Sequence, residues 1–345
     1  MIKIGIVGHI DSMAFDGQTV KTKELYKALK EVYGEEQILY ASLGESRKNP
    51  IAFFLQCLKL MKKCENIIIL PAHNAVRVLV PFFSIMRKKN TCKLFYSVIG
   101  GWLPEFLEKR KYLLKALEKF NGIWVETNSM KEKLMRQGLE NVEVIPNFKD
   151  LKILSEEELV YNENPPFKLC TFSRVMKEKG IEDAINVLKE INEESGEIKF
   201  TLDIYGKVDS GYVEEFEKMQ QMFPEYIRYC GVVEPDKSVD VLKSYFALLF
   251  PTYYEGEGMP GTIIDAYFSG VPVIATNWRY NEEIVKHKFC GYIYDYKNKV
   301  LLCNILMEIY IEPEIFNGMK KNCIREAERY SKEKVIELLK KNMEC

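Results

Sequence analysis

The sequence predicts an α/β protein with two domains, each built on a parallel sheet, and two observations lead to this prediction. Short apolar runs of strand length alternate along the chain with longer stretches of helical spacing, the pattern that strand–helix–strand units produce. The length of 345 residues also fits two domains better than one. A charged, proline-containing stretch without apolar periodicity predicts a linker at 149–166, between domains at 1–148 and 167–331.

The individual elements follow from apolar spacing and from Gly, Pro and capping residues at their ends. Strands are expected at 2–8, 38–40, 66–70, 93–98, 122–126, 142–145, 167–172, 200–205, 227–230, 245–250 and 271–275. Helices are expected at 20–32, 50–64, 76–87, 104–120, 129–137, 181–191, 213–222, 239–245, 262–269, 300–311, 313–330 and 332–343.

Charge is unevenly distributed, although the net charge is only −1. Residues 1–150 hold 24 Lys and Arg against 16 Asp and Glu, and the remainder holds 25 against 34. Within 51–120 the counts are 13 basic and 4 acidic. The basic first half indicates either an anionic partner or a solvated basic surface that attracts the acidic second half.

Several classes of protein are disfavoured by what the sequence lacks. There is no apolar run of about twenty residues, and the apolar stretch at the start is too short and strand-like for a signal peptide. Nine cysteines without a C-x-x-C pair indicate reduced thiols in a cytoplasm rather than a zinc site or disulfides. The absence of G-x-G-x-x-G argues against a dehydrogenase, and the basic stretch lacks a recognisable nucleic-acid-binding module.

The most informative stretch is 250–276, FPTYYEGEGMPGTIIDAYFSGVPVIAT. It predicts a strand, a glycine-rich turn, a short helix and a second strand. Glycines allow close backbone approach, and the first N–H groups of the helix point outward, so the turn can bind a phosphate. Glu257 and Asp265 flank this turn, eight residues apart. An acidic loop that only caps a helix is the alternative.

This stretch resembles the E-x7-E signature of family 4 glycosyltransferases. The resemblance implies the GT-B fold, in which two Rossmann-like domains face each other across a cleft and the last helix, 332–345, packs back on the first domain. It also implies that Glu257 contacts the transferred sugar and that Asp265, which replaces the usual Glu, binds the nucleotide ribose. The diphosphate would be held by backbone groups of Gly258, Met259, Pro260, Gly261 and Thr262.

A second motif follows the strand at 167–172, where Arg174 and Lys179 keep the spacing of the family's G-R-x-x-x-x-K-G. The resemblance implies that both cations clamp the donor diphosphate, and fixed cations do stabilise the charge of a departing diphosphate. Two surface cations in a loop are the alternative. Gly206 matches the family's I-Y-G segment, and Val232 lies where relatives contact the nucleotide base.

Two residues of the first half are weaker candidates. Gly17, in the loop expected at 9–19, matches a family glycine near the donor diphosphate, although a plain tight turn explains it equally. His73 follows the strand at 66–70, at the end where open α/β sheets bind ligands. It either orients the acceptor or catalyses, or it is a structural histidine. The family's own histidine after the strand at 93–98 is missing here.

Three stretches of the first half, 53–63, 82–93 and 104–120, mix large apolar residues with Lys and Arg. Such stretches can lie on an anionic membrane, or they are ordinary helices packed on a sheet. We therefore expect a cytoplasmic protein that either stays free or binds peripherally to the inner face of the plasma membrane.

The expected function is a retaining glycosyltransferase that moves a hexose or aminosugar from a nucleotide diphosphate sugar to a hydroxyl acceptor. A lipid-linked glycan of cell-surface polysaccharide synthesis is the expected acceptor. No cofactor or metal is expected, since the sequence has no Asp-x-Asp motif. A GT-B sugar-nucleotide epimerase and a non-catalytic nucleotide-sugar-binding protein are the alternatives. The sugar, base, linkage and oligomeric state are not defined by the sequence.

Overall fold

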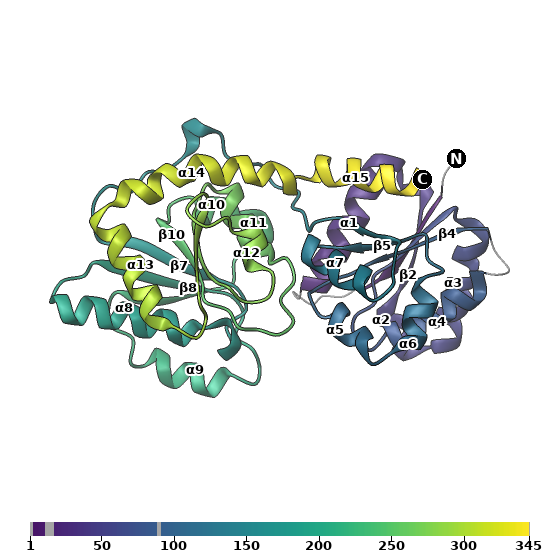
Figure 1. The fold of residues 1–345 in the computed structure, drawn as a ribbon, viewed down its shortest axis with the longest axis horizontal. Helices are drawn as coiled ribbons and strands as arrows, with labels where there is room; N and C mark the ends of the chain where they lie inside the picture. The colour runs from purple at the N-terminus through teal and green to yellow at the C-terminus, as the bar shows by residue number, and fades with distance from the viewer. Residues whose placement is uncertain (1–2, 11–16, 88–90, 345) are drawn as a thin grey trace. The chain divides into compact units, whose positions relative to one another are not determined.

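The computed structural model describes residues 3–10, 17–87 and 91–344, and the chain forms two compact units (Figure 1). Unit 1 comprises Met1–Asp150 and Ser331–Cys345, and unit 2 comprises Leu151–Tyr330. Each unit contains one six-stranded sheet whose paired strands are all parallel. The predicted α/β class, with a parallel sheet in each half, is confirmed.

The sheet of unit 1 has the strand order β2-β1-β3-β4-β5-β6. Chain order reverses between β1 and β3, so the carboxyl ends of these two strands form the point where such sheets bind ligands. The strands are β1 (Ile4–Gly8), β2 (Ile38–Ser42), β3 (Asn66–Ile69), β4 (Lys93–Ser97), β5 (Gly122–Val125) and β6 (Val142–Val144). The helices are α1 (Gly17–Tyr33), α2 (Leu43–Lys48), α3 (Pro50–Lys63), α4 (Val76–Met86), α5 (Leu103–Glu108), α6 (Lys111–Leu117), α7 (Asn128–Arg136) and α15 (Lys332–Glu344).

The last helix, α15, is part of unit 1. Its buried residues Val335 and Leu339 share one core with Ile4 of β1 and Leu25 of α1. Figure 1 shows α15 in yellow, next to α1. Lys332, at the start of α15, is anchored by Asp150. The helix is therefore part of the packed core of unit 1.

The sheet of unit 2 has the order β12-β11-β10-β7-β8-β9, with its reversal between β7 and β10. One core lies under α8, α9 and α13, and a second under α10, α11 and α12, with α14 adding residues to both. The strands are β7 (Phe167–Phe172), β8 (Phe200–Tyr205), β9 (Ile227–Gly231), β10 (Ala247–Phe250), β11 (Val273–Thr276) and β12 (Gly291–Tyr294). The helices are α8 (Ile181–Ser195), α9 (Val213–Gln220), α10 (Ser238–Leu242), α11 (Gly261–Phe268), α12 (Asn281–Ile284), α13 (Lys299–Ile311) and α14 (Pro313–Ala327).

The segment expected to be a linker, 149–166, packs from residue 151 onward as part of unit 2. Leu154 and Leu159 are buried in the core beneath α11, and the Leu154 N–H donates to the carbonyl of Phe268 at 3.0 Å. Two leucines five residues apart give no helical or strand period. For this reason the sequence pattern did not reveal the packing.

Several helix boundaries differ from the sequence prediction, among them two in unit 1. The single helix expected at 104–120 is two helices, α5 and α6, because Arg110 leaves the helical region with φ −135° and ψ 59°. Its guanidinium then donates to the Phe106 carbonyl at 2.7 Å, which satisfies the end of α5. Helix α1 begins at Gly17, earlier than expected, and residues 11–16 of the predicted loop lie outside the described residues, as do residues 88–90 of the basic stretch at 82–93.

Candidate active site

Most of the residues singled out in the second half lie near the carboxyl ends of β7 and β10. Arg174 and Lys179 follow β7, and the turn that contains Glu257 follows β10. These strands are neighbours, and they are the pair between which strand order reverses. A parallel sheet with that topology leaves an open crevice at this point, so unit 2 brings the two predicted motifs to its natural ligand site.

Lys179 and Glu257 form a direct ion pair. The Lys179 Nζ donates to the Glu257 Oε2 at 2.6 Å, and the two residues are only 8% and 7% exposed. The Thr252 hydroxyl donates to the same carboxylate oxygen at 3.0 Å. A buried carboxylate needs such partners, because an unpaired charge away from water is costly. The pair fixes the predicted sugar-contacting acid and one predicted phosphate-binding cation as a single unit.

The backbone position directly after Lys179 requires glycine. Gly180 has φ +71°, and a Cβ there would lie 2.1 Å from the carbonyl oxygen of Pro251, at the exit of β10. The turn after β7 therefore presses against the turn after β10 with no room for a side chain. This close approach places Lys179 next to Glu257.

The ring of Tyr254 connects the second cation to the first. The Lys179 Nζ lies 5.2 Å from the ring centroid, and the Arg174 Cζ lies 5.9 Å from it. Both distances are within the range of cation–π attraction. The backbone of Tyr254 is fixed by a residue that follows β11, because Trp278 Nε1 donates to the Tyr254 carbonyl at 2.7 Å. Tyr254 thus gathers two positive charges on one aromatic surface.

Arg174 is more exposed than Lys179 and has one acidic partner, Asp209, at 3.3 Å. The Gly211 N–H and the Arg174 guanidinium lower the pKa of Asp209, against a smaller opposing effect of burial. The Arg174 side chain is 45% exposed, and a clamp on a ligand's diphosphate requires such accessibility.

The start of α11 forms the other side of the site. Residues 257–260 are all buried, and Gly261 opens the helix after Pro260. The Thr262 hydroxyl oxygen is buried and has no hydrogen-bond partner among the described residues. It lies beside the first helix N–H groups, which lack partners within the helix. An unpaired hydroxyl and outward N–H groups suit an anionic ligand.

Asp265 lies one helical turn further along α11 and is buried. Its carboxylate accepts a hydrogen bond from the Ser238 hydroxyl at 3.2 Å, at the start of α10. This contact orients the carboxylate that the sequence analysis assigned to a ribose. That role stays a prediction.

Gly206 and Val232 lie at the ends of β8 and β9, on the far side of β7 from β10. A Cβ at Gly206 would lie 1.8 Å from the carbonyl oxygen of Ser173, so this glycine lets β8 close against the turn that carries Arg174. Val232 is exposed just beyond β9. Both positions are compatible with the predicted donor contacts, which they do not establish.

The remaining predicted residues, Gly17 and His73, belong to unit 1. Gly17 is the first residue of α1, and an added Cβ would meet nothing within 4 Å, so no close approach among the described residues of unit 1 requires glycine there. His73 lies in the turn between β3 and α4, in contact with Trp102 and Phe106. Partial burial and the charges of Arg77 and Arg110 lower the pKa of His73, so it is neutral at neutral pH.

Thr252, Tyr254 and Ser238, which support the site residues, were not predicted from the sequence. A buried ion pair in unit 1 was not predicted either. Lys21 on α1 lies 2.6 Å from Glu126 after β5, and its Nζ also donates to the Val98 carbonyl at 3.2 Å. Tyr254 and Thr252 lie inside the signature stretch 250–276, so their position in that stretch could have indicated a role at the site. Lys21 and Glu126 are 105 positions apart, and no local pattern connects them.

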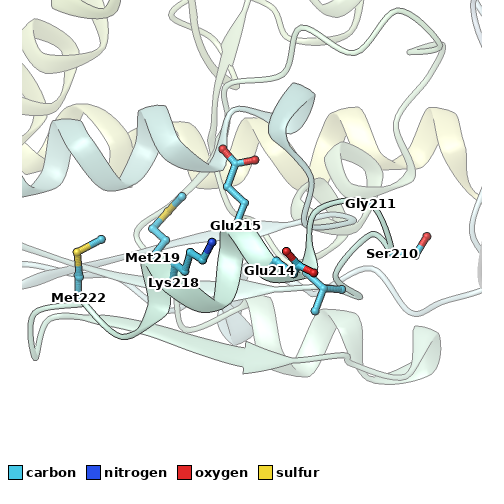
Figure 2. Close-up of a pocket in the computed structure, with 8 residues that line it drawn as sticks. Ser210, Gly211, Glu214, Glu215, Lys218, Met219 and Met222 are labelled. Atoms are coloured by element: carbon cyan, nitrogen blue, oxygen red, sulfur yellow. The ribbon is translucent and has the colours of Figure 1, made fainter.

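Other features of the described residues narrow the site further. They contain no group of three His, Cys, Asp or Glu side chains that could hold a metal ion. Nor do they include a helix long and apolar enough to cross a membrane. A hollow of about 680 Å³ lies along α9 (Figure 2). It is lined by Ser210, Gly211, Val213, Glu214, Glu215, Lys218, Met219 and Met222, none of which is a predicted site residue.

Comparisons with known proteins agree with this geometry. Residues 166–310 match the model of the family described as Glycosyl transferases group 1. The Anabaena protein HepE, in a crystal structure with UDP, superposes with a TM-score of 0.76 at 15% identity, covering 99% of this chain and all of that one. At that identity the likeness concerns the fold alone.

Two curated proteins are similar in sequence. The GtfA subunit of a UDP-N-acetylglucosamine–peptide N-acetylglucosaminyltransferase from Streptococcus gordonii is 25% identical over 265 residues, 72% of this chain and 49% of that protein. A UDP-Gal:α-D-GlcNAc-diphosphoundecaprenol α-1,3-galactosyltransferase from Escherichia coli is 30% identical over 84 residues, 24% of this chain and 21% of that protein. The chain thus spans about half the length of the streptococcal relative and less of the other.

Two six-stranded parallel sheets with helices agree with the GT-B fold, and the likeness to HepE confirms that fold. The match to the group 1 glycosyl transferases covers residues 166–310, which form most of unit 2. The recognition made from the sequence is confirmed at this level, and so is the enzyme class, glycosyltransferase. Assignment to family 4 stays a prediction.

Proposed function

We propose that this chain transfers a hexose or aminosugar from a uridine diphosphate sugar to a hydroxyl acceptor, with retention of anomeric configuration. The observation that carries the proposal is the Lys179–Glu257 pair, which shares the ring of Tyr254 with Arg174 at the strand reversal of unit 2. The names of the relatives, which specify UDP or UDP-sugars, support uridine as the base.

The side chains divide the chemistry between them. Arg174 and Lys179, with the N–H groups at Gly261 and Thr262, would stabilise the diphosphate as it gains negative charge during cleavage. Glu257, held by Lys179 and Thr252, would orient the sugar ring. Asp265 would accept hydrogen bonds from the ribose. No side chain is needed as the base if the departing phosphate oxygen takes the acceptor's proton. No metal or cofactor enters this scheme.

For the acceptor we propose a lipid-linked glycan, used by a cytoplasmic enzyme bound peripherally to an anionic membrane face. The basic excess of residues 51–120 supports this, as does the diphosphoundecaprenol acceptor of the Escherichia coli relative. On α3, Ile51 and Leu55 are exposed and apolar, and the helix ends in Lys62 and Lys63. Such a helix can insert apolar side chains among anionic headgroups.

The donor site is tested by thermal unfolding with UDP, its sugars and the other nucleoside diphosphates. A ligand that binds only the folded chain raises its melting temperature. We expect UDP compounds to stabilise the wild type and to lose most of this effect in Arg174→Ala. Arg325→Ala is the matched control, because Arg325 is also an exposed arginine of unit 2 with one acidic partner, Glu156 at 3.5 Å. Failure of every nucleotide to stabilise the wild type would overturn the proposal.

Product analysis then separates the transferase from its alternatives. Anomeric configuration of the product, read by NMR, tests retention. An epimerase would convert the sugar nucleotide without any acceptor, and a binding protein would show neither transfer nor slow donor hydrolysis. Sedimentation with anionic vesicles at low salt tests the membrane proposal, which fails if the vesicles do not retain the protein.

A further inference from the structure

A group of aromatic and basic side chains lies at the carboxyl ends of β3 and β4 in unit 1. We call it the Phe106 cluster. It consists of His73, Arg77, Trp102, Phe106 and Arg110. The turn after β3 supplies the histidine, α4 supplies Arg77, and the α5 region after β4 supplies the rest. The location is the ligand-binding edge of an open parallel sheet.

The aromatic part of the cluster is closely packed. The ring of Phe106 lies 4.4 Å from that of His73 and 5.2 Å from that of Trp102, and His73 and Trp102 are 4.6 Å apart. The Trp102 indole N–H donates to the Ile99 carbonyl at 2.8 Å, which fixes its ring. Phe106 is buried, whereas His73 is exposed and Trp102 is half-buried. The cluster thus has a rigid base with a solvent-facing rim.

Two arginines surround this base. The Arg110 Cζ lies 3.8 Å from the centroid of Phe106, and the Arg77 Cζ lies 5.4 Å from it. Arg110 spends one N–H on the Phe106 carbonyl, which positions its guanidinium. Of the residues that the structure describes, no Asp or Glu pairs with Arg77, Arg110 or His73. Glu105 on α5 is engaged with Lys133.

We infer that the Phe106 cluster is an acceptor subsite that binds a phosphoryl group. This inference rests on the proposed transferase function and adds the chemistry of acceptor recognition. Guanidinium groups bind phosphate oxygens through two parallel N–H donors, and stacking on aromatic rings pre-orients them for it. The neutral His73 adds a hydrogen-bonding group, and Trp102 offers a surface for an adjoining sugar. The phosphoryl group belongs either to a sugar phosphate end of the acceptor or to a lipid headgroup.

The test measures binding of N-acetylglucosamine 1-phosphate, with unphosphorylated N-acetylglucosamine as reference, at saturating UDP to keep the phosphate out of the donor site. We expect Arg77→Gln, and separately Arg110→Lys, to weaken binding of the phosphate compound at least tenfold. Arg110→Lys keeps the charge while removing the planar fork. Arg136→Gln, at another exposed arginine of unit 1, is the matched control and should leave affinity unchanged.

The outcomes are distinct from those of the donor-site test. Equal affinity of the wild type, Arg77→Gln and Arg110→Lys would overturn the inference, while stabilisation by UDP would still support the proposed function. Sedimentation with vesicles that contain or lack phosphatidic acid distinguishes the two sources of the phosphoryl group. Loss of phosphatidic-acid-dependent retention in both variants assigns the subsite to a lipid headgroup, and loss of sugar phosphate binding alone assigns it to the acceptor.

Discussion

The Nζ of Lys179 lies 2.6 Å from the Oε2 of Glu257, although the two residues are 78 positions apart in the sequence. One residue follows β7 and the other follows β10, and both are buried. The motifs that the sequence presents separately are therefore one electrostatic unit in the fold. A charge change at either residue affects the other, so single substitutions report on the pair.

Glu257→Gln is expected to destabilise unit 2 by about 3–5 kcal/mol, because it leaves the buried ammonium of Lys179 without its counterion. The double variant Lys179→Met/Glu257→Gln should be more stable than the sum of the single changes predicts. Urea denaturation of the four proteins measures this coupling.

The matched control is the exposed pair Lys131–Glu143, at 2.9 Å, for which a coupling below about 1 kcal/mol is expected. Additive effects at 179 and 257 would show that the buried pair is not coupled. Under the proposed function, both single variants and the double variant at Lys179 and Glu257 should lose activity.

The fold could be predicted from the sequence, and so could the turns that carry the candidate motifs. Glycine-rich turns after apolar strands gave the β10–α11 unit, and the spacing of Arg174 and Lys179 gave the turn after β7. These features are local in the chain, since turn chemistry and apolar period act within a few residues.

Contacts between distant segments were not predictable in the same way. The shared ring of Tyr254 and the Lys21–Glu126 pair depend on which strands become neighbours, which no local pattern encodes. The single helix predicted at 104–120 was wrong, because the apolar periodicity continues across Arg110 although the backbone there leaves the helical conformation. Apolar spacing indicates which face of a helix is buried, but it does not reveal a break in the helix whose end is capped by a side chain.

Gly180→Ala should destabilise unit 2 much more than Gly196→Ala. The two glycines have nearly the same φ, +71° and +70°, so the cost of a left-handed alanine, about 1 kcal/mol, is common to both. Only at Gly180 would the new Cβ meet backbone, 2.1 Å from the Pro251 carbonyl oxygen. Chemical denaturation of both variants measures the difference. Similar losses would mean that the two turns can separate without cost.

Tyr254→Leu should weaken UDP binding several-fold, whereas Tyr254→Phe should not. The ring attracts both Lys179 and Arg174, and each such contact is worth about 0.5–2 kcal/mol. Phenylalanine keeps the ring, and the hydrogen bond from Trp278 goes to the backbone, so it survives in both variants. Titration calorimetry with UDP gives the affinities. Equal binding by the leucine and phenylalanine variants would exclude a role of the ring in placing the cations.

Lys320→Met is expected to stabilise the chain at neutral pH. Lys320 on α14 is almost fully buried, its Nζ donates to the Tyr245 carbonyl at 3.2 Å, and burial lowers its pKa from 10.5 to about 8. This lowering of the pKa corresponds to a cost of roughly 3 kcal/mol for burying the charged form in the folded chain. The hydrogen bond to Tyr245 is lost on substitution, which reduces the gain from Lys320→Met by about 1 kcal/mol. A melting temperature several degrees above that of the wild type is therefore expected at pH 7.

The pH dependence distinguishes charge from packing as the cause. Below pH 8 both folded and unfolded chains hold the Lys320 proton, so the full cost is present. Between pH 8 and 10.5 the unfolded chain keeps the proton that the folded chain has lost, so the contribution of this group to stability rises with pH. The advantage of Lys320→Met should shrink across that window. Lys321→Met, at an exposed lysine paired with Glu156, is the control, and its melting temperature should stay close to that of the wild type. An advantage of Lys320→Met that is the same at pH 7 and pH 10 would assign the gain to packing instead of charge.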